Sequence, residues 1–343
     1  MPPPLRPLAN PPNPWATTDV EYLEGEAPNA SLEVYEDHTR GVLAHNDSPD
    51  VGFSWSVNPY RGCFHACAYC YARPSHEYLS FGAGTDFDRK IVVKTRAPAL
   101  LREAFDDPKW KGELVVFSGV TDCYQPLEAS YRLTRGCLEA CLEYRNPAGI
   151  ITKSPLVERD APLLAELAQS ARLHVSLSIP FWDESKARAI EPFVTTPARR
   201  VRAIERLARA GVPVGVMVAP IIPGLNDEDM PDVLRAARDA GATWAGTVLL
   251  RLPGPVKEVF SERLRAVLPL RADKVLRRIR ETRGGKLNDA RFGVRGTGEG
   301  AYAEVIRALF ERTAKDLGFE THWMERDEPG TTFRRPRGQL SLF

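Results

Sequence analysis

The chain has 343 residues, enough for one large domain with extensions or for two small domains. Hydrophobic residues make up 43% and charged residues 27%, which is ordinary for a globular protein. The net charge of +1 does not by itself indicate a nucleic-acid partner, and no apolar run is long enough to span a membrane.

The first part of the chain is expected to lie outside the main domain. Residues 1–30 are rich in proline and are predicted to be a flexible lead, because such stretches do not build a packed core. Residues 31–50 are predicted to be an arm or an edge strand that precedes the main domain.

From residue 51 onward, short apolar runs alternate with helical patterns. The predicted strands are 51–57, 113–118, 149–152, 173–179, 212–219 and 243–249. The predicted helices are 97–105, 128–144, 161–170, 199–210 and 228–240. This alternation favours parallel pairing through right-handed βαβ units. Six units do not close an eight-stranded barrel, so the predicted fold is α/β, an open (β/α)6 partial TIM barrel over residues 31–255. A helical extension is predicted over 256–325 and a polar, basic tail over 326–343.

Three cysteines stand close together in the loop after the first predicted strand. Cys63, Cys67 and Cys70 have the spacing Cys-x3-Cys-x2-Cys. An odd number of thiols cannot all form disulfides with one another, but they can converge on a metal. An iron–sulfur cube of four irons normally takes four cysteines, so three ligands leave one iron open for a substrate or cofactor. The six cysteines of the chain also favour a reducing compartment.

Two other metal sites are consistent with the same cysteines. A zinc ion would use them together with His65 or His76, and a closed cluster would take Cys123, Cys137 or Cys141 as its fourth ligand. Structural zinc sites usually show two separated Cys-x2-Cys pairs, and a second pair is missing here. Cys137 and Cys141 stand four residues apart on a predicted helix, where packing in the core explains them. The cluster with one open iron is therefore the favoured interpretation.

With Tyr69 as the aromatic residue before its third cysteine, the motif resembles the signature of radical S-adenosylmethionine (SAM) enzymes. The resemblance implies a [4Fe–4S] cluster held by the three cysteines, with SAM bound to the open iron. It also implies reductive cleavage of SAM to a 5′-deoxyadenosyl radical, which abstracts hydrogen from a substrate. An electron donor such as flavodoxin or ferredoxin is implied as a partner, and an oxygen-sensitive cluster fits a cytoplasmic location.

Polar residues gather at the ends of the predicted strands, where the active sites of such barrels lie. Lys153, after the third strand, is the predicted partner of the SAM carboxylate, with Arg199 or Arg200 as its rival. Ser176 and Ser178 share one face of the fourth strand and are predicted to meet the ribose hydroxyls. The other residues predicted to surround the cofactor are Tyr69, Ser118, Gly119 and Ala219.

A closer resemblance, to the spore photoproduct lyase family, covers roughly residues 50–250. It rests on the stretches Asn58-Pro-Tyr-Arg-Gly-Cys63, Thr121-Asp122, Thr152-Lys153, Ser178 with Glu191-Pro192, and Val218-Ala-Pro-Ile221. In that family, SAM radical chemistry reverses a thymine dimer in DNA, and a lysine corresponding to Lys153 meets the SAM carboxylate. The resemblance implies a lyase that acts on DNA in repair. The alternatives are a radical enzyme for a small molecule or a protein, and a non-catalytic iron–sulfur binding module.

The hydrogen-donor cysteine of that family does not correspond cleanly to a residue of this chain. The family cysteine precedes the Thr/Ser-Asp pair, where this chain has Gly119. Cys123 follows the pair instead, and it is predicted to return hydrogen to a product radical. Packing as a small buried side chain is the alternative for Cys123.

The end of the chain combines a basic stretch with an apolar tip. Arg334, Arg335 and Arg337 are predicted to lie on a solvated, flexible tether that could contact phosphates. The tip is similar to the peptide that bacterial replication and repair proteins dock into the sliding clamp. The residues expected to make that contact are Gln339, Leu340, Leu342 and Phe343. The alternative is a tail that docks on its own barrel.

Overall fold

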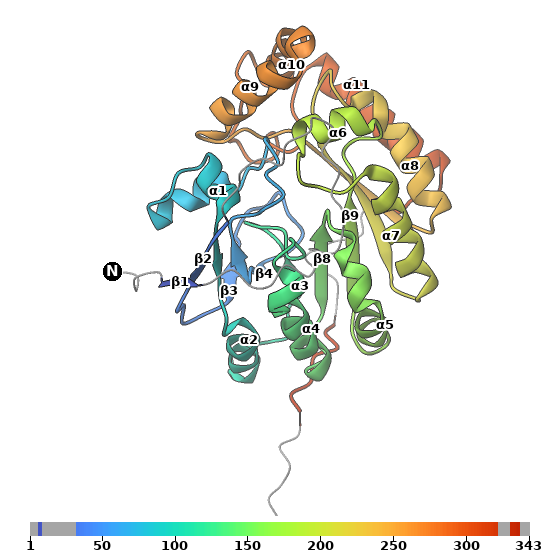
Figure 1. Ribbon diagram of the computed structural model, residues 1–343. Helices are drawn as coiled ribbons and strands as arrows, with labels where there is room; N and C mark the ends of the chain where they lie inside the picture. The colour runs from blue at the N-terminus through green and yellow to red at the C-terminus, as the bar shows by residue number, and fades with distance from the viewer. Residues whose placement is uncertain (1–5, 9–31, 322–329, 337–343) are drawn as a thin grey trace, which may run out of the picture.

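The computed structural model describes residues 6–8, 32–321 and 330–336. Its larger sheet has seven strands in the order β11-β10-β9-β8-β7-β4-β3 (Figure 1). The strands are β3 (Leu43–His45), β4 (Trp55–Val57), β7 (Val115–Phe117), β8 (Ala148–Thr152), β9 (Leu173–Ser178), β10 (Val214–Ile221) and β11 (Trp244–Leu249). All neighbouring pairs from β4 to β11 are parallel, and only β3 pairs antiparallel, with β4. The predicted open barrel of six parallel strands is thereby confirmed, with β3 added at its first edge.

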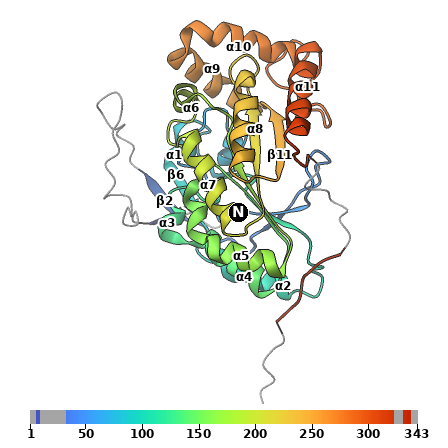
Figure 2. The ribbon, with the colours of Figure 1, turned by 90° about the vertical axis from the view of Figure 1, so that its right-hand side faces the viewer.

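Helices cover the outer face of this sheet (Figures 1 and 2). They are α2 (Ala97–Asp106), α3 (Glu128–Tyr131), α4 (Leu133–Glu143), α5 (Ala161–Ser170), α7 (Pro197–Arg209) and α8 (Met230–Asp239). In α7, Ala203, Ile204 and Leu207 recur at helical spacing and are fully buried, so they pack this helix on the sheet. The single helix predicted for 128–144 is instead two helices, because Arg132 adopts a left-handed conformation with φ of 53° between α3 and α4.

A second, smaller sheet was not predicted as such. Its strands run in the order β1-β2-β6-β5, namely β1 (Arg6–Leu8), β2 (Glu33–Glu36), β6 (Lys90–Val93) and β5 (Tyr60–Arg61). The prediction of a flexible lead is therefore wrong for residues 6–8, and the remainder of 1–30 lies outside the described residues. β5 pairs antiparallel with β6 directly before Cys63, so the small sheet supports the start of the cysteine loop.

The region predicted to be a helical extension contains three helices and a long loop. The helices are α9 (Val256–Val267), α10 (Pro269–Glu281) and α11 (Ala301–Asp316), and the loop spans 282–300. α9 and α10 lie above the carboxyl ends of the strands, while α11 packs beside α8 (Figure 2). Val256, Phe260 and Leu276 share one apolar cluster with Cys67 and Tyr69. The helices after the barrel therefore contribute to the core beneath the cysteine loop.

The segment 330–336 is docked on the barrel, which corrects the prediction of a flexible tether for Arg334 and Arg335, while Arg337 lies outside the described residues. The ring of Phe333 packs against Phe105 and Tyr144, with centroids 6.1 and 6.2 Å away. Arg334 N donates to the Tyr144 carbonyl at 2.8 Å, and Arg335 donates to the carbonyls of Phe105, Asp107 and Trp110. We call residues 330–336 the strap. The tip at 339–343 lies outside the described residues.

No helix in the described part of the chain is both long and apolar enough to cross a membrane.

Candidate cofactor site at the carboxyl ends of the strands

The cysteine loop runs from β5 to the 3-10 helix η1 (Arg73–Leu79). Cys63 and Cys67 are buried and Cys70 is half-buried. Successive turns bring them together: Ala66 N donates to the Cys63 carbonyl and Cys70 N to the Cys67 carbonyl, both at 3.2 Å. Gly62, with φ of 78°, permits the close approach that starts the loop, because a Cβ there would lie 2.8 Å from the Phe87 carbonyl oxygen.

Arg73 holds the backbone of this loop from beneath. Its side chain is 2% exposed, and its guanidinium donates to the carbonyls of Ala66 and Cys67 and to Asp88, the last at 2.9 Å. It also donates to the carbonyls of Ala83 and Gly84, and a single buried cation therefore organises both ends of the segment.

The loop after β7 clamps the cysteine loop from the other side. Gln125 is fully buried; its Oε1 accepts from Phe64 N and its Nε2 donates to the Gly62 carbonyl, both at 3.1 Å. Thr121 Oγ1 donates to the same carbonyl at 2.6 Å, and Asn58 Oδ1 accepts from Val120 N at 3.0 Å. The two loops are therefore one hydrogen-bonded unit in which each buried amide group is satisfied.

Asp122 connects this unit to the end of β8. Its carboxylate accepts from Thr152 Oγ1 at 2.6 Å and from Lys153 N at 2.7 Å, and His65 Nδ1 lies 3.4 Å away. Burial raises the pKa of Asp122, but His65 and these hydrogen bonds outweigh burial and lower the pKa to about 2. Asp122 is therefore an ionised carboxylate that fixes the backbone of Lys153.

A second buried network joins the aromatic residue of the motif to β9. Tyr69 donates its hydroxyl to Glu191, and Glu191 accepts from Arg200 Nη2 at 2.6 Å. Arg200 Nη1 also donates to the Ser178 carbonyl at 2.8 Å, and all four residues are buried. Arg200 is thus occupied by Glu191, and its neighbour Arg199 pairs with Glu158. Neither arginine is available in this arrangement as the rival partner for the SAM carboxylate.

Lys153, by contrast, is an available cation beside the cysteine loop. Its ammonium lies 5.7 Å from the centroid of the Tyr69 ring and makes no hydrogen bond or ion pair with any residue that the structure describes. Burial lowers the pKa of Lys153, but Cys67, Glu191 and Asp122 outweigh burial and raise it above its ordinary value. Lys153 is therefore a charged, half-buried group beside the cysteine loop, with its donors free.

The other predicted cofactor residues divide between the mouth of the barrel and its interior. Ser178 and Ala219 lie near the carboxyl ends of β9 and β10, and Ser118 lies just after β7 and donates its hydroxyl to the Ile151 carbonyl at 2.5 Å. Gly119 lies beside Asn58, whose side-chain amide would be 3.5 Å from a Cβ at position 119. Ser176 lies one side-chain row deeper in the barrel, is fully buried, and accepts from Trp244 Nε1 at 3.1 Å. In this structure Ser176 is thus a packing residue, and Ser178 is the better placed of the two serines.

Cys123 lies apart from the cysteine loop. Its side chain is fully buried in the main core, and its sulfur is 3.9 Å from the Phe117 carbonyl oxygen. Burial raises the pKa of its thiol well above the ordinary value, so the thiol is protonated. This environment is that of a packing residue, and the role as hydrogen donor stays a prediction.

The donor set fits an iron–sulfur cluster better than zinc. Within the described residues, no three His, Cys, Asp or Glu side chains converge on the position of one metal ion. His76 Nε2 is 2.9 Å from the Lys90 carbonyl oxygen, and His65 faces Asp122. A cluster spreads its cysteine ligands over different irons and does not require such convergence. Cys123, Cys137 and Cys141 belong to the main core, an apolar cluster that does not include Cys63 or Cys67, so no fourth cysteine lies with the three.

An open parallel barrel with three cysteines and a free lysine at its mouth is the architecture of a radical enzyme that uses SAM. Residues 57–237 match the Radical SAM superfamily, and the chain belongs to that superfamily. Its cofactors are accordingly a [4Fe–4S] cluster and SAM, and it is an enzyme.

Relatives with similar sequences are found in bacteria and archaea. An uncharacterised protein of Mycobacterium tuberculosis is 41% identical over 210 residues, which cover 61% of this chain and 62% of that protein. An uncharacterised protein of Methanocaldococcus jannaschii is 32% identical over 199 residues, covering 58% of this chain and 71% of that protein. The chain thus matches less than two thirds of the length of its mycobacterial relatives.

Solved structures of spore photoproduct lyase share the fold. A variant with bound AdoMet and dinucleoside spore photoproduct has a TM-score of 0.58 at 15% identity, covering 84% of this chain and 80% of the lyase chain. Another variant has a TM-score of 0.60 at 15% identity, with coverage of 83% and 80%. At this identity the likeness concerns the fold alone.

Sequence patterns did not identify the residues that hold the site together. Arg73 begins the short 3-10 helix η1, and Gln125 stands in the irregular loop after β7. In such short segments, hydrophobic periodicity does not indicate a side chain's partner. Glu191 stands in one of the stretches that resemble spore photoproduct lyase, and that was the available signal for its role.

Proposed function

We propose that this enzyme binds SAM at the barrel mouth with Lys153 as the partner of the SAM carboxylate, and that it acts on a DNA lesion in a reaction of the spore photoproduct lyase type. The observation that supports the binding role is the free ammonium of Lys153 beside Tyr69 and the cysteine loop. A half-buried ammonium without a hydrogen-bond acceptor is costly to keep unless a ligand supplies one.

Different residues at the barrel mouth would bind different parts of the cofactors. Cys63, Cys67 and Cys70 would hold the cluster, and Ser178 and Ala219 would line the nucleoside part of SAM. When bound, the cluster and SAM together supply one-electron chemistry that yields a hydrogen-abstracting radical. Tyr69 contributes indirectly: its hydrogen bond to Glu191 fixes the loop that carries Cys67 and Cys70 against β9.

Removal of the Lys153 ammonium tests the binding role. Lys153→Met should weaken SAM binding by about 2–5 kcal/mol, the cost of leaving a buried carboxylate without its charged partner. The measurement is SAM titration of the anaerobic holo-protein, with iron content and cluster absorbance unchanged. Lys109→Met, at an exposed position, is the control and should bind SAM like the wild type. Wild-type affinity in Lys153→Met would contradict the proposal.

The reaction type needs a separate experiment. Two observations support it: the lyase-like stretches include Asp122, Lys153 and Glu191, which the structure brings together around the cysteine loop, and the overall fold matches that of the lyase. The reduced holo-protein, incubated with SAM and dinucleoside spore photoproduct, should release thymine-containing product. SAM cleavage without consumption of the dinucleoside would exclude this lesion as the substrate.

A second candidate is a radical reaction on a small molecule or a protein. The burial of Cys123 in the main core favours it, because a fully buried thiol is poorly positioned to return hydrogen to a substrate radical. If Cys123→Ala leaves both SAM cleavage and product yield unchanged, the lyase mechanism with a cysteine donor is ruled out.

Partner proteins complete the proposal. A flavodoxin or ferredoxin would deliver the electron, and the tip Gln339, Leu340, Leu342 and Phe343 would bind a bacterial sliding clamp. The strap docks at the amino-terminal end of the barrel, on the side opposite the cysteine loop. Deletion of 339–343 should abolish clamp binding in calorimetry and leave SAM cleavage intact. Absence of clamp binding by the full chain would overturn this part.

A further inference from the structure

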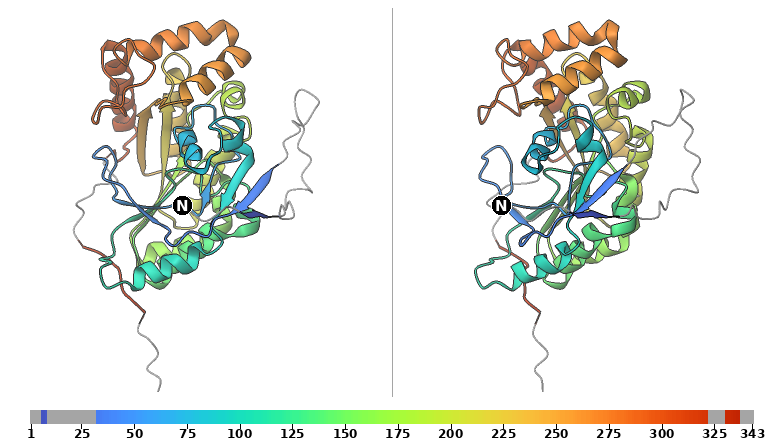
Figure 3. Two further views of the ribbon diagram at one scale, coloured as in Figure 1. Left: turned by 90° about the vertical axis from the view of Figure 1, so that its left-hand side faces the viewer. Right: turned by 60° about the vertical axis from the view of Figure 1, so that its left-hand side comes forward.

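Three arginines surround the carboxyl end of β11, and two of them are engaged by hydrogen bonds to other segments. Arg283 is buried and donates to the carbonyls of Leu249, Leu250 and Val294. Arg295 pairs with Asp50 and Ser48, from the loop between β3 and β4, and Asp50 also accepts from Gly293 N at 2.7 Å. These bonds join the two edges of the open barrel, where the loop 46–54 meets the loop 282–300 (Figure 3).

Arg251, the third arginine, has no such partners. It is half-buried, and it makes no hydrogen bond or ion pair with any residue that the structure describes. Its guanidinium carbon lies 5.5 Å from the centroid of the Tyr71 ring. Burial and the neighbouring Arg295 lower the pKa of its guanidinium, and Tyr71 and Asp50 offset this lowering only in part.

The position of Arg251 connects it to the cofactor site. Leu250 and Leu252, its two neighbours in the chain, belong to the apolar cluster that contains Cys67 and Tyr69. Tyr71 directly follows Cys70 and is 51% exposed. Arg251 and Tyr71 therefore form a charged and aromatic surface on the solvent side of the cysteine loop.

We propose that Arg251, positioned by Tyr71, binds an oxyanion of the substrate at the barrel mouth. The inference rests on the proposed function, in which Lys153 binds the SAM carboxylate. Arg251 is then a second free cation, and it can bind an anionic group of the substrate. A guanidinium presents five donors in a plane and matches a phosphate or a carboxylate through paired hydrogen bonds. The exposed ring of Tyr71 offers an adjacent flat face for stacking.

The test compares charged with uncharged ligands on the anaerobic holo-protein in the presence of SAM. One arm uses thymidylyl-thymidine, with a single phosphodiester, and its uncharged methylphosphonate analogue. The other arm uses a tripeptide containing glutamate and its glutamine counterpart. Calorimetry measures the affinities of the wild type, Arg251→Met and Arg295→Met. Because binding is measured without turnover, the result is independent of whether the protein cleaves SAM or which reaction it performs.

In one of the arms, we expect the wild type to prefer the charged ligand by about tenfold or more, the range for a charge-assisted hydrogen bond. Arg251→Met should remove this preference, while Arg295→Met, whose arginine is already paired, should keep it. Arg251→Gln replaces the methionine variant if that variant loses its cluster absorbance. The proposal is overturned if the wild type shows no preference in either arm, if the preference survives loss of Arg251, or if Arg251→Met weakens SAM binding instead.

Discussion

The two ends of the barrel solve the burial of polar groups in different ways. At the carboxyl end, Arg73, Gln125, Glu191 and Arg200 are buried, and each holds a loop through several hydrogen bonds. At the amino-terminal end, the interior is closed by Trp244, which lies over Gly215 and donates to Ser176. Buried charges cost free energy unless every one is paired, so their concentration at one end marks the end where chemistry requires a rigid polar site.

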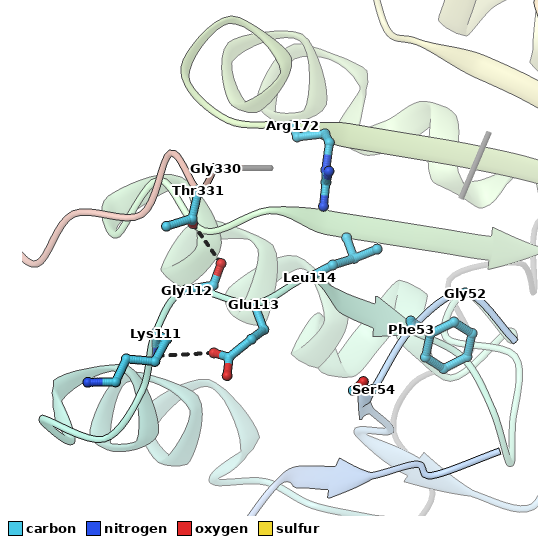
Figure 4. A pocket seen from close by; sticks show the side chains of 10 residues that line it. All are labelled: Gly52, Phe53, Ser54, Lys111, Gly112, Glu113, Leu114, Arg172, Gly330 and Thr331. Carbon is cyan, nitrogen blue, oxygen red and sulfur yellow. Dashed lines mark hydrogen bonds between the residues drawn. The ribbon is translucent and has the colours of Figure 1, made fainter. Parts of the chain in front are cut away.

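The amino-terminal end also contains the strap and a cavity beside it. The cavity has a volume of about 310 Å³ and is lined by residues that include Lys111, Glu113 and Arg172. In Figure 4, Thr331 of the strap bonds to the Gly112 carbonyl at the rim of this cavity, and Lys111 and Glu113 lie beside it. It lies at the opposite end of the strands from the three cysteines, so this cavity is not the candidate cofactor site. The candidate cofactor site is therefore marked by cations beside cysteines and not by this cavity.

Removal of the cysteines should have the largest effect. Cys63→Ala, Cys67→Ala and Cys70→Ala together should abolish the iron–sulfur absorbance of the anaerobically reconstituted protein, because no other cysteine lies in the loop. The double variant Cys137→Ala, Cys141→Ala is the control, since both cysteines pack in the core of the described barrel. Retention of the full cluster content in the triple variant would show that the ligands lie elsewhere.

Loss of Arg73 should destabilise the cysteine loop without changing a cluster ligand. Arg73→Met leaves Asp88 without its buried partner and several carbonyls without a donor, which should cost about 3–5 kcal/mol of unfolding free energy. Denaturant unfolding of the apo-protein measures the loss, and iron content per chain should fall as well. Arg96→Met removes an exposed arginine that pairs with Glu103, and should cost under about 1 kcal/mol. Equal stability of the two variants would show that Arg73 does not stabilise the cysteine loop.

The two serines of β9 allow the most direct comparison between the two ends of the barrel, because Ser178 lies at the mouth and Ser176 lies deeper. Ser176→Ala should lower the unfolding free energy by about 1–3 kcal/mol, because Trp244 Nε1 loses its buried acceptor, and it should leave SAM affinity unchanged. Ser178→Ala should weaken SAM binding and change stability less. A loss of SAM affinity in Ser176→Ala would show that Ser176 contributes to the cofactor site and would contradict its assignment as a packing residue.

The strap should give the smallest effect. Phe333 is half-buried between Phe105 and Tyr144, so Phe333→Ala should cost about 1–2 kcal/mol by loss of apolar contact. Thermal unfolding measures this loss, and SAM affinity should be that of the wild type. A cost near zero would mean that the strap does not stabilise the barrel end.

Local patterns determined most of the barrel. The alternation of strands and helices predicted six parallel strands, and helix 161–170 was placed at the observed bounds of α5. The spacing of the three cysteines identified the cofactor class, because that chemistry depends on ligands from one short loop. Short irregular pairings such as β5 with β6 escaped prediction, since a two-residue strand has no periodicity to detect.

The sequence by itself determined the radical SAM class, the open parallel barrel and Lys153 as the lysine that follows its third strand. Only the tertiary structure decided which of the polar residues face one another. It pairs Arg200 with Glu191 and leaves Lys153 and Arg251 without a hydrogen-bonded carboxylate among the described residues. It also places Ser176 one row below Ser178 and docks the strap on the barrel. The physical reason is that a side chain's partner depends on contacts between segments far apart in the chain, and these contacts leave no trace in local spacing or composition.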